Sequence, residues 1–74
     1  MTTQVLEYLI AIEEEHSLTR AAERFYLSQP SLSYHLAKAE QELNVKLFQK
    51  KGRSLLPTED GIIFFKACPL STLD

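Results

Sequence analysis

Small polar side chains follow one another through residues 29–38, at spacings that place them on one side of a helix. Leu32 and Leu36 face the other side, since a helix turns by about 100° per residue. Outward amides and hydroxyls can hydrogen-bond to base edges in the DNA major groove, which admits a helix. The pattern therefore predicts DNA recognition rather than catalysis. The polar side consists of Gln29, Pro30, Ser31, Ser33, Tyr34 and Lys38.

Three of these side chains could form hydrogen bonds with DNA. Gln29 could read adenine through N6 and N7, or could bond only to the backbone at its own helix start. Ser31 and Ser33 are small enough to let the helix enter the groove, and their hydroxyls could donate to phosphate. The plainer interpretation is that both are ordinary exposed serines.

The other three residues offer apolar or charged contacts. Tyr34 could stack on a sugar, touch a thymine methyl or bond to phosphate, and Pro30 could make apolar base contact. Lys38 lies further along the helix and would meet phosphate or only solvent. We predict DNA contact for Tyr34, and leave both readings open for Lys38.

Phosphate-binding groups are expected at two helix starts. Thr19 and Arg20 begin the helix before the polar one, and Ser28 caps the polar helix itself. Helix N-termini favour anions, so these residues are candidates for the DNA backbone. Arg20 could instead pair with Glu23 or Glu42.

A basic turn follows the polar helix. Lys50, Lys51 and Arg53 surround Gly52, and Arg53 could enter a narrow minor groove. The plainer interpretation is a solvated turn between two strands.

Histidines and serines do not form a catalytic or metal-binding pattern. His16 and His35 fall on different helices, and no Cys or acidic residue completes a ligand spacing. Ser31 and Ser33 do not share a helix face with His35, which excludes a Ser–His pair of that kind. We expect no metal, no cofactor and no enzyme activity, and interpret His35 as a half-buried packing residue.

Hydrophobic spacing and capping residues predict helices at about 3–14, from 18 to 25 or 26, at 29–43, and from 59 onward. Strands are expected at Lys46–Lys50 and Ser54–Leu56, with Pro57 ending the hairpin. The last helix should bury Ile62, Phe64 and Phe65, although its surplus apolar surface could also serve a subunit contact. Pro69 should end this helix near Cys68. This layout is a winged helix-turn-helix, mainly α with a small β-hairpin. The expected apolar residues of the last helix are Ile62, Ile63, Phe64 and Phe65.

Size and composition indicate one small domain. The chain has 74 residues and is 45% hydrophobic, which excludes a disordered tail. It contains no apolar run near the ~20 residues of a membrane span, and no basic leader. The single Cys68 cannot form an internal disulfide, so the reduced cytoplasm is the expected compartment. We assign residues 1–67 to the domain and 68–74 to a tail.

Charge is distributed unevenly along the chain. The formal net charge is −2, which by itself argues against DNA binding. Residues 1–15 hold four acidic and no basic residues, whereas residues 46–53 hold four basic and no acidic ones. Such a dipolar module can bind DNA through one face, weakly as a single copy.

Several motifs occur together in the order of one known family. They are S-L-T-R-A-A-E at 17–23, S-Q-P-S-L-S at 28–33, E-Q-E-L-N-V-K-L-F at 40–48 and T-E-D-G at 58–61. With the first helix, the match covers about residues 4–67. The chain resembles the N-terminal DNA-binding domain of LysR-type transcriptional regulators. It departs from that pattern at Tyr34 and Lys50, where the family most often has Arg, and at Pro57, where Leu is usual.

The resemblance implies a bacterial, cytoplasmic regulator that forms dimers or tetramers on promoter DNA. Small-molecule effectors would act only through a C-terminal domain absent here. The helix from about residue 58 would be the start of a truncated linker helix that pairs two copies together with the first helix. The chain would then be an isolated domain, excised or naturally short.

The predicted function is sequence-specific binding of double-stranded DNA. The helix at about 28–43 would lie in the major groove, and the wing at about 46–57 on the flanking backbone or minor groove. Two copies would read a dyad-related site. The alternative is a winged-helix protein-interaction module without DNA binding, which the acidic first helix favours modestly.

Overall fold

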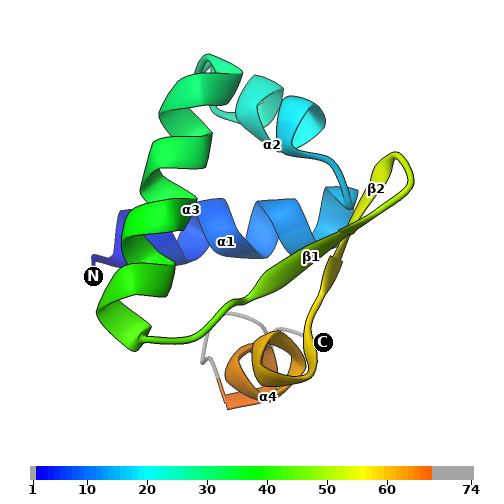
Figure 1. The fold of residues 1–74 in the computed structure, drawn as a ribbon. Helices are drawn as coiled ribbons and strands as arrows, with labels where there is room; N and C mark the ends of the chain where they lie inside the picture. Colours follow the sequence, from blue (N-terminus) through cyan, green and yellow to red (C-terminus); the bar gives the residue numbers. More distant parts are fainter. Residues whose placement is uncertain (1, 68–74) are drawn as a thin grey trace.

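A computed structural model describes residues 2–67. Its elements run in the order helix, helix, helix, hairpin, helix (Figure 1), and confirm the predicted winged helix-turn-helix layout. The elements are α1 (Thr3–Glu15), α2 (Leu18–Arg24), α3 (Gln29–Leu43), β1 (Phe48–Lys51), β2 (Ser54–Pro57) and α4 (Glu59–Ala67).

Helix starts lie where hydroxyl side chains predict them. Ser17 Oγ accepts the backbone N–H of Arg20 at 3.3 Å, and Ser28 Oγ accepts that of Ser31 at 3.3 Å. Each bond satisfies an amide that has no partner within its own helix. Thr58 caps α4 in the same way, through Gly61 N–H at 3.0 Å.

The three N-terminal helices enclose the core. Leu9 and Ile12 of α1, Ala22 of α2 and Leu32 of α3 are buried together. The Ala22 carbonyl accepts the N–H groups of Phe25 and Leu27 at 3.1 and 2.9 Å, which forms the tight turn after α2. This turn begins at Phe25, so α2 ends one or two residues earlier than predicted.

The hairpin is antiparallel and is hydrogen-bonded to the end of α1. Phe48 pairs with Pro57 and Lys51 with Ser54, in antiparallel register. In β2 the N–H of Leu55 donates to the His16 carbonyl at 2.9 Å. The predicted first strand started two residues too early, because the backbone of residues 46–47 bonds to α3 and to Thr58 instead of to β2.

The buried side of α4 differs from the prediction. Phe65 is buried and Phe64 packs partly against the core, but Ile62 and Ile63 are 44% and 62% exposed. Gly61 lies against the Leu47 carbonyl. At about 100° per residue, Ile63 then falls on the opposite side of the helix and Ile62 at its edge. Assigning Ile62 to the core was therefore wrong, and the predicted apolar side at Ile63 is exposed.

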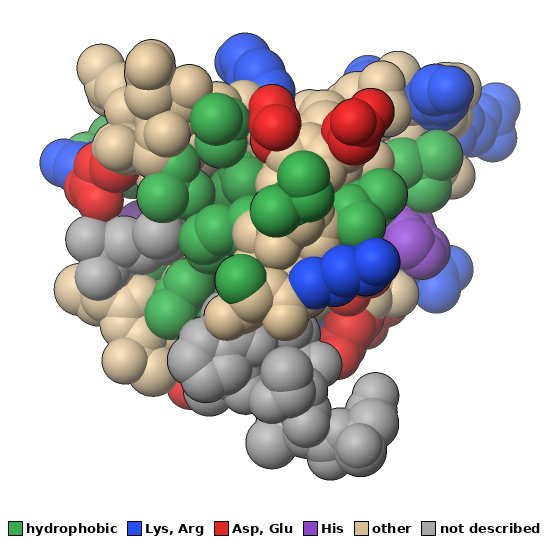
Figure 2. Space-filling model, turned by 90° about the horizontal axis from the view of Figure 1, so that it is seen from below, with side chains coloured by type: hydrophobic (Ala, Val, Ile, Leu, Met, Phe, Trp, Pro, Cys, Tyr) green, Lys and Arg blue, Asp and Glu red, His purple; other side chains and the backbone are tan. Residues whose placement is uncertain are grey.

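Hydrophobic side chains gather on the face of the molecule that carries α4, as Figure 2 shows from below. The predicted end of α4 at Pro69 and the tail lie outside the described residues. No helix within residues 2–67 combines the length and the hydropathy of a membrane span.

Candidate nucleic-acid interface

The polar side of α3 is exposed along its whole length. The opposite side carries the buried Leu32 and Ala39, with Leu36 and Leu43 packed against the core. The helix therefore presents a convex polar surface instead of burying it. Its exposed members are Gln29, Pro30, Ser31, Ser33, Tyr34 and Lys38, as the sequence predicts.

One groove joins this surface to the hairpin and to the start of α2. Gln29 and Ser33 line it from α3, Thr19 from α2, and Lys50 and Arg53 from the hairpin. Its volume is about 330 Å³. Five of the predicted residues, from three elements, thus surround one concave surface with two positive charges at its edge.

Tyr34 and Lys38 lie on the edge of the polar side of α3 that is away from the hairpin. They border a second hollow beside Thr2 and Val5 at the start of α1. The Lys38 Nζ lies 5.8 Å from the centroid of the Tyr34 ring, within reach of a cation–π contact. The structure therefore does not bring Tyr34 and Lys38 together with the hairpin.

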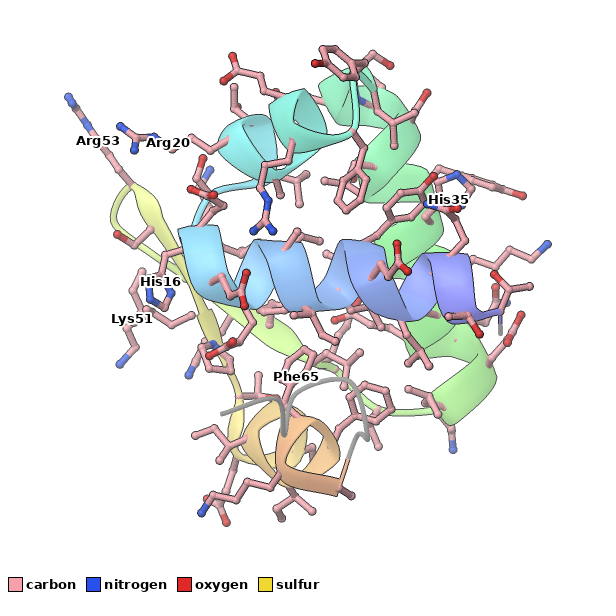
Figure 3. The ribbon with its side chains drawn as sticks, turned by 180° about the vertical axis from the view of Figure 1, so that it is seen from behind. His16, Arg20, His35, Lys51, Arg53 and Phe65 are labelled. Atoms are coloured by element: carbon pink, nitrogen blue, oxygen red, sulfur yellow. The ribbon has the colours of Figure 1, made fainter. Side chains whose placement is uncertain are left out.

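Arg20 is exposed at the start of α2, and Figure 3 shows it extending from the same edge of the molecule as Arg53. The ion pairs of α2 that the structure describes use Arg24, whose guanidinium lies 2.9 Å from Glu14 and 3.6 Å from Glu15. The alternative in which Arg20 pairs with Glu23 or Glu42 is not seen among residues 2–67.

The basic residues of the hairpin do not share one face. Lys50 lines the groove, whereas its neighbour Lys51 is exposed but does not line it. Successive side chains of a strand point to opposite faces, which explains the difference. In Figure 3, Lys51 lies toward His16, away from Arg20.

Two polar residues that line the groove were missed from the sequence. Ser17 was interpreted only as a helix cap, and Ser54 only as a strand residue, yet both border the groove. Ser54 is paired with Lys51 across the hairpin, so its place beside the basic turn was the available signal. The Ser28 hydroxyl, in contrast, makes two hydrogen bonds to Ser31. It accepts the Ser31 backbone N–H and donates to the Ser31 hydroxyl at 3.0 Å.

The two histidines have different places in the fold. His35 is half-buried, and its ring centroid lies 5.2 Å from that of Tyr8, which confirms the packing role predicted for it. His16 is the C-cap of α1 in a left-handed conformation. Among residues 2–67, no three His, Cys, Asp or Glu side chains converge as metal ligands.

A short helix pair whose second helix is exposed, beside a basic hairpin, defines the class of winged helix-turn-helix proteins. A sequence profile described as "Bacterial regulatory helix-turn-helix protein, lysR family" matches residues 3–62. The chain belongs to this LysR family of bacterial regulators, which is a family of transcriptional regulators and not of enzymes.

Individual relatives support the assignment. The chain is 41% identical over 64 residues to the uncharacterized regulator YxjO of Bacillus subtilis, covering 86% of this chain and 22% of that protein. It thus spans about a fifth of such a relative.

Two solved structures are also similar. The DNA-binding domain of BenM, a regulator of Acinetobacter baylyi, in complex with benA site 1 DNA superimposes with a TM-score of 0.84 at 33% identity, covering 89% of this chain and 74% of that one. The CbnR DNA-binding domain in a DNA complex gives 0.83 at 30%, covering 89% and 76%.

Proposed function

We propose that this chain binds double-stranded DNA in a sequence-dependent manner, as the DNA-binding domain of a LysR-type transcriptional regulator. The observation that carries the proposal is the groove at which the polar side of α3, the start of α2 and the basic hairpin meet. A major groove admits a helix presented in this way, and a basic edge contributes phosphate contacts.

Base contacts are assigned to the exposed side of α3. Gln29 and Ser33 face the groove and take the central positions, with Pro30 beside them. Tyr34 contacts a sugar or a thymine methyl at the edge away from the hairpin. An amide, a hydroxyl and apolar surface together suit the mixed pattern of the major groove.

Phosphate contacts are assigned to the residues around this centre. They hold the module in register but do not read sequence. On this assignment the hairpin lies along the flanking backbone or minor groove. The phosphate-contacting residues are Thr19, Arg20, Ser28, Ser31, Lys38, Lys50, Lys51 and Arg53.

The similarity to two DNA-bound domains supports this function over the alternative of a protein-interaction module. Both of those domains were solved as complexes with DNA, and both superimpose on most of this chain. The acidic residues of α1, on which the alternative rested, do not line the groove. The alternative is therefore not favoured.

Two copies are proposed to form a dimer through α4 and α1. In this proposal residues 58–67 are the beginning of a linker helix. Ile62 and Ile63 supply exposed apolar surface on α4 for such a contact. We assign residues 1–67 to the DNA-binding domain and 68–74 to a tail, and the bacterial cytoplasm as the compartment. Any effector would act through a domain outside these residues.

Titration of a labelled random-sequence duplex, followed by fluorescence anisotropy at increasing salt, tests the proposed function. The logarithm of the binding constant should fall linearly with the logarithm of salt concentration, because bound phosphates release counterions. Binding that is absent at low salt would overturn the proposal.

A further inference from the structure

Glu40 of α3 reaches the chain segment that leads into the hairpin. Its Oε2 accepts the backbone N–H of Leu47 at 2.7 Å and that of Phe48 at 3.3 Å. The side chain is only 12% exposed, and Lys46 Nζ lies 3.9 Å from its other oxygen. A carboxylate that accepts amide hydrogen bonds makes stronger contacts than a neutral group does. The start of β1 is therefore held to α3 by a charged, largely buried contact.

The carbonyl side of the same segment is held by the start of α4. The Leu47 carbonyl accepts Thr58 N–H at 2.9 Å, and the Lys46 carbonyl accepts the Thr58 hydroxyl. The segment 46–48 thus lies between two anchors. Glu40 fixes its amides to α3, and Thr58 fixes its carbonyls to α4.

Glu40 also lies on the side of α3 that faces the hairpin. At about 100° per residue it falls within about 20° of Gln29 around the helix axis. Gln29 lines the groove from α3, and Lys50 and Arg53 line it from the hairpin. The Glu40 contact therefore ties the start of the strand that carries Lys50 to the side of α3 that carries Gln29.

We propose that Glu40 is a positioning residue for DNA binding, which holds the hairpin at the distance from α3 where both address one duplex. This inference rests on the proposed function. A hairpin held in place before binding loses less conformational freedom when the complex forms. Glu40 itself does not line the groove and is not assigned a DNA contact.

The test uses Glu40→Gln in the 74-residue chain. Glutamine keeps the shape and one acceptor oxygen but removes the charge, so the contact weakens while the fold is retained. The matched control is Glu7→Gln, an exposed acid on α1 whose removal changes the net charge equally. Loss of a negative charge alone should raise affinity for DNA slightly, since phosphate repulsion falls.

Each change is made in two backgrounds, the natural hairpin and one with Lys50, Lys51 and Arg53 replaced by Ala. Binding of a labelled random-sequence duplex of about 20 base pairs is measured by anisotropy at low salt. Glu40→Gln should weaken binding by about three- to tenfold with the natural hairpin, and lower the salt slope by about one. With the neutral hairpin the loss should shrink to less than about twofold.

An equal loss in both backgrounds would overturn the proposal, because Glu40 would then act within α3 alone. Unchanged affinity with the natural hairpin would overturn it as well. Hydrogen exchange of the Leu47 and Phe48 amides, measured without DNA, should be faster in Glu40→Gln. If the unaltered chain fails to bind DNA, the proposed function itself fails, and the exchange rates separately decide whether Glu40 holds β1.

Discussion

Gln29 and Arg53 line the same groove but carry different chemistry. Gln29 offers an amide that can donate and accept at once, in the way an adenine edge requires. Arg53 offers a charge at the turn of the hairpin, which attracts any phosphate. A base reader and a phosphate binder should therefore differ in how their loss depends on sequence.

Replacing each with Ala separates the two roles. Gln29→Ala should relax the preference at one base position and weaken the preferred duplex by about 1–3 kcal/mol. Arg53→Ala should weaken all sequences alike and reduce the salt slope by about one. Selection of bound duplexes from a random pool measures the base preference. Affinities of the selected duplexes then measure the loss of binding. Uniform loss across sequences for Gln29→Ala would remove it from base reading.

Tyr26, in the turn between α2 and α3, has a backbone conformation that its side chain disfavours. Its φ is 56°, in the left-handed region, and its side chain is 97% exposed. Asn tolerates this region better than other residues with a Cβ, apart from Asp and His. Tyr26→Asn should therefore stabilise the fold by about 0.5–1 kcal/mol in thermal unfolding. Tyr26→Ala is the control and should stabilise the fold less than Tyr26→Asn does. An equal gain from Ala would show that the left-handed backbone conformation is not the cause.

Among the elements, the helix starts and the apolar sides of the helices could be predicted from the sequence, because their causes are local. Ser17, Ser28 and Thr58 each cap a helix through an amide three residues on. The burial of α4 was not predictable in this way. It depends on the contact between Gly61 and the Leu47 carbonyl, which lies fourteen residues earlier in the sequence. No local sequence pattern indicates that contact.

The close approach at Gly61 has a measurable consequence. A Cβ at this position would overlap the Leu47 carbonyl oxygen, which is backbone and cannot turn aside. Helix propensity alone predicts that Gly61→Ala stabilises α4 by about 1 kcal/mol. We expect the overlap to dominate, so that chemical denaturation shows a loss of about 1–3 kcal/mol. A gain in stability would show that α4 does not dock through Gly61.

The candidate interface shows the same division between local and distant causes. The exposed side of α3 follows from helical spacing, so all six of its predicted residues are exposed. Which of them face the hairpin depends on how the hairpin docks. Gln29 and Ser33 share its groove, whereas Tyr34 and Lys38 border the start of α1.

At the scale of the whole molecule, charge and apolar surface are separated. The four basic residues within 46–53 belong to the hairpin region, and the four acidic ones within 1–15 to α1. The exposed Ile62 and Ile63 lie on α4. Figure 2 shows hydrophobic side chains gathered on the face of the molecule that carries this helix. We propose that the polar, basic side meets DNA and that the apolar side of α4 meets a second copy.

Self-association through α4 can be tested by light scattering at increasing protein concentration. Ile63→Glu places a charge in the proposed contact and should shift the mass toward the monomer, since burying an unpaired charge is costly. Gln49→Glu, an exposed change of the same charge on β1, should leave the mass unchanged. A mass that is the same for all three chains at every concentration would contradict the proposed contact.

We infer that the exposed side of α3 and the adjoining hairpin form the surface that meets DNA. Backbone amide shifts, followed by NMR as a duplex is added, test it directly. The largest shifts should occur at the start of α2, over residues 29–34 and in the hairpin turn, with little change in α4. Shifts that concentrate on α1 or α4 while residues 29–34 stay unchanged would show that DNA binds elsewhere on the molecule.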